Sequence, residues 1–408
     1  MAKKKTVKKA GTTPVAKKPV KQKPAVGGGA NEAASSPAAL AALSELRTKI
    51  DRLDQRLVKL LNDRADLVVS VGSLKRGGDI PIYAPHREAQ VLEKALARNA
   101  GPLQNRTIEG VYRELMSGSF ALEQPLRIGY MGPMGSFSHQ AGVKHFGSSV
   151  EFEDLRTIEG VFTEVRRGHV DYGLVPIENS VGGGVTETLD AFLEHARHVS
   201  VYAEAQIAVD YALLANCEPG SVARIHATPE VFRQCQKWLG TQYPKADQIA
   251  AGSSGDAARS AAEESRRAVE IGYAPASAAI GTPLAGETYG LNTLFERVED
   301  RPGNVTRYLV VSRQKALRSG SDKTSVMFLT GDRPGALVSV LKIFEEAGVN
   351  LSHIDKRPSR EENWRYTFFI DARGHREDAV VARVLRDARS ICEELVVLGS
   401  YPESKRVL

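Results

Sequence analysis

A long amphipathic segment near the N-terminus constrains the fold more than any other feature. Between Leu43 and Leu74, apolar residues recur at the helical period of about 3.6 residues, and Gly77-Gly78 then ends the pattern. At ~1.5 Å per residue, a helix of this length is roughly 50 Å long. Such a helix cannot bury its whole apolar stripe within one small helical domain. We therefore expect it to pack against a second copy of the same chain.

Two shorter helical segments follow the long one. The first begins after Pro85 and runs to about Arg98, and the second runs from about Gln104 to Leu122, just before Pro125. Residues 37–125 contain no segment with the alternating pattern of a strand, so they predict an all-helical domain.

The remainder of the chain predicts mixed structure on both sides of a boundary near residue 320. In residues 126–314, short apolar runs such as Tyr172–Val175 and Tyr308–Val311 alternate with helical stretches, which is typical of an α/β domain. Residues 322–404 show the order βαββαβ of a ferredoxin-like α+β plait. Residues 1–36 are rich in Lys, Ala and Pro, and we expect them to be disordered because they offer too little apolar surface to offset chain entropy.

Charge and cysteine content narrow the functional classes. Residues 1–30 hold nine lysines and no acidic residue, whereas the rest of the chain has 46 basic against 49 acidic side chains, so the body offers no compositional case for binding nucleic acid. The three cysteines lie far apart and form no CxxC pair, which favours a reducing, cytoplasmic setting. No run of about 18 apolar residues appears, so we expect no membrane span.

Two cations lie on the apolar side of the long segment. Arg64 follows Leu46 by 18 positions, which is five helical turns, and Lys75 lies 11 positions further on. Buried cations are costly unless paired, so these two either pair within the protein or line a pocket that neutralises an anion. Arg47 lies ~26 Å from Arg64 along the axis. It can therefore reach the same small ligand only from a second subunit.

This pattern resembles the all-helical class of chorismate mutase, through Leu46–Asp54, Leu60–Arg64, Lys75 and Arg87-Glu88. The resemblance implies an intertwined homodimer, or a larger homo-oligomer, that rearranges chorismate to prephenate without a metal or a cofactor. It assigns catalysis to Lys75 and Glu123, and substrate contacts to Arg47, Arg64, Glu88 and Ser119. Some members of the family have a glutamine where this chain has Glu123, which can donate a hydrogen bond only when it is protonated.

Three later stretches suggest ligand-binding loops. Gly132–His139 precedes a helix, where free backbone amides can bind an anion. Pro176–Val185 contains three consecutive glycines that allow a ligand to approach the backbone closely. Asn304–Tyr308 places a hydroxyl beside a cation at the start of a strand. Each stretch taken alone is equally consistent with an ordinary helix cap, turn or strand start.

Together, these stretches resemble prephenate dehydratase across residues 126–314. The resemblance implies two lobes like those of type II periplasmic binding proteins, with prephenate converted to phenylpyruvate in the cleft. It makes Thr306 catalytic, assisting departure of the ring hydroxyl. It assigns substrate contacts to Ser136, Glu178, Asn179, Ser180 and Arg307. The segment from Thr228 to Cys235 departs from the family pattern, and we assign it no role.

The C-terminal plait resembles the ACT regulatory domain of prephenate dehydratases, through Gly335-Ala336-Leu337 and Asp355–Pro358. The resemblance implies feedback inhibition by L-phenylalanine bound at a subunit interface. The implied effector contacts are Gly335, Ala336, Leu337, Asn350, Leu351, Asp355, Arg357 and Pro358. Asp355-Lys356 stands where the family usually has Glu-Ser.

The order of mutase, dehydratase and ACT parts resembles the bifunctional P-protein family of L-phenylalanine biosynthesis. One alternative is a prephenate or arogenate dehydratase whose helical part only dimerises, and the retained Arg47, Arg64, Lys75 and Glu88 argue against it. A second alternative is a non-enzymatic ligand sensor whose basic tail reaches nucleic acid. The Thr306-Arg307 pair and the near-neutral body argue against that one.

Overall fold

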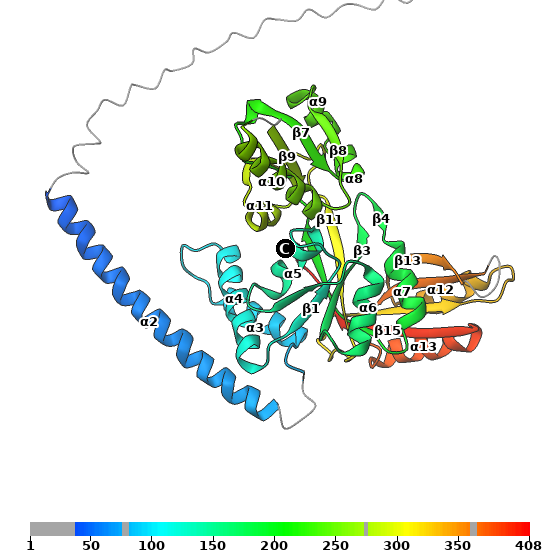
Figure 1. Ribbon diagram of the computed structural model, residues 1–408. Helices are drawn as coiled ribbons and strands as arrows, with labels where there is room; N and C mark the ends of the chain where they lie inside the picture. The colour runs from blue at the N-terminus through cyan, green and yellow to red at the C-terminus, as the bar shows by residue number, and fades with distance from the viewer. Residues whose placement is uncertain (1–36, 76–80, 273–275, 360–364) are drawn as a thin grey trace, which may run out of the picture. The chain divides into compact units, whose positions relative to one another are not determined.

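The computed structural model describes residues 37–75, 81–272, 276–359 and 365–408 (Figure 1). The tail that we predict to be disordered, residues 1–36, lies outside this range. The chain divides into two compact units, residues 1–63 and 64–408. Among the described helices, none combines the length and the apolar character that crossing a membrane requires.

The predicted long helix is α2 (Pro37–Lys75), and it is followed by α3 (Pro85–Ala97) and α4 (Asn105–Glu123). Pro85 stands in the first turn of α3, where a missing N–H costs nothing. The apolar stripe of α2 is largely exposed, with Leu46, Leu53 and Leu60 each more than half accessible. The helical character of this region is confirmed.

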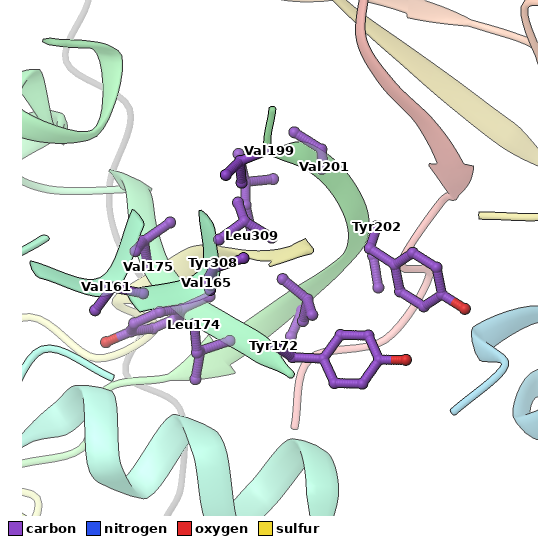
Figure 2. Close-up of a cluster of buried hydrophobic side chains, with 14 of the residues drawn as sticks. Val161, Val165, Tyr172, Leu174, Val175, Val199, Val201, Tyr202, Tyr308 and Leu309 are labelled. Carbon is purple, nitrogen blue, oxygen red and sulfur yellow. The ribbon is translucent and has the colours of Figure 1, made fainter. Parts of the chain in front are cut away.

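An aromatic cluster attaches the α3–α4 hairpin to the next domain. Tyr83, which precedes α3, is fully buried and meets the rings of Phe120, Phe146 and Tyr172 edge to face. Its carbonyl oxygen accepts a hydrogen bond from the Tyr202 hydroxyl at 2.7 Å. Tyr172 and Tyr202 extend the same core that fills the first lobe of the α/β domain (Figure 2).

The first lobe is built on a mixed sheet of order β2-β1-β3-β11-β5, with the short β4 paired to β3. Strands β1, β2 and β3 are parallel, whereas β11 runs antiparallel to both β3 and β5. The strands are β1 (Arg127–Tyr130), β2 (Glu151–Asp154), β3 (Tyr172–Asn179), β4 (Gly183–Gly184), β5 (Ser200–Ala208) and β11 (Val305–Ser312). The helices are α5 (Phe137–Phe146), α6 (Ile158–Arg167) and α7 (Thr186–His195).

The second lobe has a five-stranded sheet of order β10-β6-β9-β7-β8. The chain enters this lobe after β5 and returns to the first lobe in β11, so it crosses between the lobes twice. The strands are β6 (Ala212–Ala215), β7 (Val222–Ala227), β8 (Asp247–Ala250), β9 (Ala276–Gly281) and β10 (Asn292–Glu296). The helices are the short η1 (Pro219–Ser221), α8 (Pro229–Gln234), α9 (Gln236–Gln242), α10 (Ser254–Ile271) and α11 (Pro283–Tyr289). The predicted two-lobed α/β fold is confirmed.

The C-terminal part is a four-stranded antiparallel sheet of order β13-β14-β12-β15 with two helices. Apolar residues of the helices, such as Val340, Phe344 and Val384, pack onto one face of this sheet. The elements are β12 (Asp322–Leu329), α12 (Ala336–Glu346), β13 (Leu351–Pro358), β14 (Tyr366–Arg373), α13 (Ala379–Ile391) and β15 (Glu394–Pro402). The predicted βαββαβ order is confirmed.

Candidate active and effector sites

Thr306 of β11 and Asn179 of β3 lie directly opposite each other in the antiparallel ladder, and the next pair along is Arg307 with Glu178. Successive side chains of a strand point to opposite faces of the sheet. Thr306 and Asn179 therefore share one face, while Arg307 and Glu178 share the other. This alternation separates residues that are neighbours in the sequence.

A fixed amide group orients the Thr306 hydroxyl. The Asn179 side-chain oxygen accepts hydrogen bonds from the backbone N–H groups of Val181 and Gly182, at 3.0 and 2.7 Å. The amide nitrogen must then face the other way, and it donates to Thr306 Oγ1 at 2.8 Å and to Asn304 Oδ1 at 2.7 Å. Because Thr306 Oγ1 accepts from Asn179, its own proton remains available for donation to a ligand.

Two residues that the sequence analysis did not select belong to this cluster. Asn304 is 3% exposed, and its amide nitrogen donates to Gln234 Oε1 at 3.0 Å. Its side-chain oxygen also accepts from the predicted Ser180 hydroxyl at 3.3 Å. Gln234 ends α8 of the second lobe, so this chain of amides joins the two lobes. Asn304 lies two residues before Thr306 in the same short motif, and this proximity could have indicated that it belongs to the site.

Ser136 has a local role in the structure. It is the N-cap of α5, where its hydroxyl accepts from the backbone N–H of His139 at 3.2 Å and donates to the Met131 carbonyl at 3.3 Å. These are the contacts of a helix cap, which satisfies an otherwise unpaired backbone donor. The structure thus gives Ser136 a capping function and does not join it to the Thr306 cluster by a hydrogen bond.

Arg307 has three carboxylate partners within the protein, and its predicted substrate contact stays a prediction. Its guanidinium is 6% exposed and lies between three carboxylates, with distances of 2.7 Å to Glu178, 2.6 Å to Asp371 and 3.3 Å to Glu204. Burial alone would lower the pKa of Arg307, but Asp371, followed by Tyr401, Glu178 and Glu204, raises the pKa above its usual value. The strand alternation described above is the physical reason why Arg307 and Thr306 lie on opposite faces of the sheet.

Glu178 likewise has protein partners, and its predicted substrate contact stays a prediction. One carboxylate oxygen accepts from Arg307 Nε, and the other lies 3.0 Å from Nδ1 of His353. The hydrogen bond with His353, together with the charge of Arg307, lowers the pKa of Glu178 to about 2. The carboxylate is therefore ionised at neutral pH. It lies on the same face of the sheet as Arg307.

Four predicted mutase residues meet in two pairs between the end of α2 and α4. Arg64 Nη1 donates to the Ser119 hydroxyl at 2.9 Å, and Lys75 Nζ donates to Glu123 Oε2 at 2.9 Å. The side chains of Lys75 and Glu123 are 20% and 9% exposed.

Glu88 is not part of this group. It lines a cavity of about 370 Å³ together with Tyr83, Arg113, His145 and Arg406. Burial raises the pKa of Glu88 to about 7, and the nearby charge of Arg113 opposes the rise. The predicted contact of Glu88 with the mutase substrate stays a prediction.

Arg47 lies in the other compact unit, on an exposed part of α2. Its predicted contribution to a site in a second subunit stays a prediction.

The predicted effector residues fall into two groups. Gly335, Ala336 and Leu337 line a cavity of about 220 Å³ that also contains Tyr366 and Phe368. Gly335 has a φ of 80°, a conformation that favours glycine. This group combines a backbone turn with aromatic side chains, as a pocket for an apolar amino acid requires.

The second group lies on β13. Arg357 makes a bidentate ion pair with Asp190 of α7, with N···O distances of 2.5 and 2.7 Å. Asp355 lies so close to Gly184 that a Cβ at that glycine would be 2.4 Å from a carboxylate oxygen. Both side chains thus face the dehydratase lobe and not the cavity beside Gly335.

The other three residues at the edges of β13 have backbone roles in the sheet. Asn350 accepts a backbone hydrogen bond from Arg373, and Leu351 and Pro358 pair with Ala372 and Tyr366 of β14.

Comparison with known proteins decides the family. A bifunctional chorismate mutase/prephenate dehydratase of Stutzerimonas stutzeri is 39% identical over 369 residues, which cover 89% of this chain and 98% of that protein. The chain belongs to the bifunctional chorismate mutase/prephenate dehydratase family. The corresponding protein of Pseudomonas aeruginosa is 38% identical over 369 residues, with coverage of 89% and 98%.

Domain-level matches agree with this family. Residues 46–124 match the chorismate mutase type II family, residues 128–316 match prephenate dehydratase and residues 324–390 match the ACT domain. The crystal structure of a prephenate dehydratase from Arthrobacter aurescens in complex with L-Phe has a TM-score of 0.61 and 34% identity, covering 69% of this chain and 92% of that one. The chain is therefore an enzyme of phenylalanine biosynthesis with both chorismate mutase and prephenate dehydratase activities.

Proposed function

We propose that the two reactions occur in separate sites of the chain, with prephenate bound beside Thr306 and chorismate bound beside Arg64 and Lys75. The observation that carries the dehydratase assignment is the hydrogen bond from Asn179 Nδ2 to Thr306 Oγ1. The mutase assignment is supported by the two cations that meet Ser119 and Glu123 between α2 and α4.

In the dehydratase site, Thr306 acts as the proton donor for the departing ring hydroxyl. The bond from the ring to its carboxylate breaks, its electron pair enters the ring and carbon dioxide leaves. The bond from the ring to the hydroxyl oxygen breaks, and its electron pair leaves with the oxygen. The hydroxyl receives the Thr306 proton and departs as water, and solvent then returns a proton to Thr306. One positioned donor suffices because the ring gains aromatic stabilisation. Asn179 keeps the threonine hydroxyl pointing its proton toward the leaving group.

The mutase site needs no proton transfer. Chorismate carries two carboxylates, and its rearrangement develops charge on the ether oxygen, so fixed cations can both bind the substrate and stabilise the transition state. Arg64 and Ser119 suit a carboxylate, and Lys75 suits the ether oxygen. Arg47 of a second copy completes the site, and the exposed apolar stripe of α2 supports a homodimer built on this helix.

L-phenylalanine is the effector that we propose for the ACT domain. The support comes from the cavity beside Gly335, Tyr366 and Phe368, and from the related dehydratase of Arthrobacter aurescens, whose structure is described as a complex with L-Phe. We also propose a cytoplasmic setting, supported by Cys217, Cys235 and Cys392, which are free thiols.

The experiment supplies full-length protein with chorismate and follows prephenate and phenylpyruvate separately. In Thr306→Ala, prephenate should accumulate at the parental rate, while phenylpyruvate formation should fall by about 10²–10⁴-fold, the usual contribution of a general acid. Thr306→Ser keeps a hydroxyl and should retain part of the rate. Thr293→Ala, at an exposed threonine of the second lobe, is the matched control. Undiminished phenylpyruvate formation in Thr306→Ala would refute the assignment.

A further inference from the structure

A buried ion network lies directly behind the catalytic strand. Its centre is Arg307, whose carboxylate neighbours Glu204 and Asp371 are 5% and 4% exposed. Lys323 of β12 adds a second cation, 3.0 Å from Glu204. Charges this deeply buried are stable only when their partners are held in place. The positions of all members are therefore coupled.

Besides Lys323, the ACT domain contributes Asp371 and His353, which contact two different strands of the dehydratase. Asp371 of β14 holds Arg307 on β11 at 2.6 Å, and His353 of β13 lies 3.0 Å from Glu178 on β3. Asp371 is itself fixed by the Ser325 hydroxyl at 2.5 Å. The ACT sheet thus contacts both β3 and β11, at two residues that pair with each other in the ladder.

The two residues that the ACT domain contacts lie next to Thr306 and Asn179. Arg307 and Glu178 form the ladder pair immediately after Thr306 and Asn179. The register between β11 and β3 shifts just beyond Arg307, so that Tyr308 faces Pro176. A bulge at this point interrupts the regular ladder. The short segment that carries Thr306 pairs regularly with β5 from Val305 to Val310, and the side-chain anchors add to this pairing in setting its position relative to Asn179.

We propose that Asp371 and His353 of the ACT domain are positioning residues of the dehydratase reaction. By anchoring Arg307 and Glu178, they set the hydrogen bond between Asn179 and Thr306 on the opposite face of the sheet. This inference rests on the proposed catalytic role of Thr306. It makes the ACT domain a structural part of the dehydratase centre in addition to its regulatory role.

The same connection gives an effector a route to the active site. Strand β14 carries Tyr366 and Phe368, which line the effector cavity, and also Asp371, which holds Arg307. A displacement of β14 upon effector binding would move the anchor of the catalytic strand.

The test uses the full-length chain with Asp371→Asn and, separately, His353→Gln. Each change keeps a polar side chain but weakens one anchor. The dehydratase kcat should fall by about 10- to 100-fold, the effect of a misplaced reacting group, with KM for prephenate little changed. Mutase activity of the same chain reports whether the protein is folded. Asp387→Asn, at an exposed acid of α13, is the matched control.

A second measurement separates positioning from general weakening. In a Thr306→Ala background, the further change Asp371→Asn or His353→Gln should lower the residual rate little, because the group that it positions is already missing. An equal fall in both backgrounds, or a parental kcat in both anchor variants, would overturn the inference. If Asp371→Asn does not fold, His353→Gln decides. A Thr306→Ala chain with full dehydratase activity would instead refute the proposed function on which the inference rests.

Discussion

At the scale of single residues, the surroundings of two glutamates shift their pKa values in opposite directions. Glu178 has a hydrogen bond with His353 and an ion pair with Arg307, and its pKa is lowered to about 2. Burial raises the pKa of Glu88 to about 7, and the charge of Arg113 opposes this rise. The first carboxylate stabilises the fold by being charged, whereas the second costs stability when it is charged.

The Glu88 environment predicts a pH-dependent stability. Because the folded-state pKa lies above the unfolded value of 4.5, the contribution is fully present below pH 4.5 and is lost as pH rises through 7. Glu88→Gln removes this titration and should stabilise the protein at pH 8 by up to ~3 kcal/mol. Urea denaturation of both proteins at pH 5 and pH 8 measures the difference. An equal loss of stability with pH in parent and variant would contradict the assignment.

At the scale of elements, strand alternation and helix ends decide what each motif can do. On β11, alternation sends Thr306 to one face and Arg307 to the other, so a contiguous motif serves two purposes. On β13, alternation turns Asp355 and Arg357 toward the dehydratase. Helix α12 has a glycine of positive φ beside each end, Gly335 before it and Gly348 after it.

These two glycines provide a matched pair of variants for the effector site. A Cβ would meet no atom within 4 Å at either position, so an alanine adds only backbone strain of ~1–2 kcal/mol. Gly335→Ala should weaken inhibition of the dehydratase by L-phenylalanine, because Gly335 lines the cavity, whereas Gly348→Ala should not. Inhibition curves for phenylpyruvate formation measure the effect. Equal sensitivity of both variants would place the effector elsewhere.

At the scale of the whole molecule, the long helix is the feature that the single chain leaves incomplete. Most of the apolar stripe of α2 is exposed, and surfaces of this kind normally mark an interface. Arg47 and Arg64 are 17 residues apart on this helix, or ~26 Å along its axis. One small substrate can contact both only if they belong to different copies.

Subunit mixing tests this arrangement. Arg47→Ala and Arg64→Ala proteins should each lose mutase activity, while both retain dehydratase activity. After the two are unfolded and refolded together, half of the dimers combine both chains, and each such dimer has one site with both arginines. About a quarter of the parental mutase sites should therefore return. No recovery despite verified mixed dimers would show that Arg47 acts within its own chain.

Much of the architecture was predictable because it depends on local patterns. The helical period of residues 43–74 and the strand and helix order of the C-terminal plait are written in neighbouring residues. The family resemblance also selected Thr306 and Asn179, which the structure brings to within 2.8 Å of each other. By contrast, Asn304 and Gln234 are 70 residues apart, and no local pattern predicts the hydrogen bond between their side-chain amides.

The sequence by itself determined the order of the three parts and the type of each element, because periodicity and motif spacing act over a few neighbouring residues. Only the tertiary structure decided which partners the side chains have. Arg307 pairs with Asp371, and Arg357 pairs with Asp190. These outcomes follow from which sheet faces come together, and that depends on contacts between segments far apart in the chain.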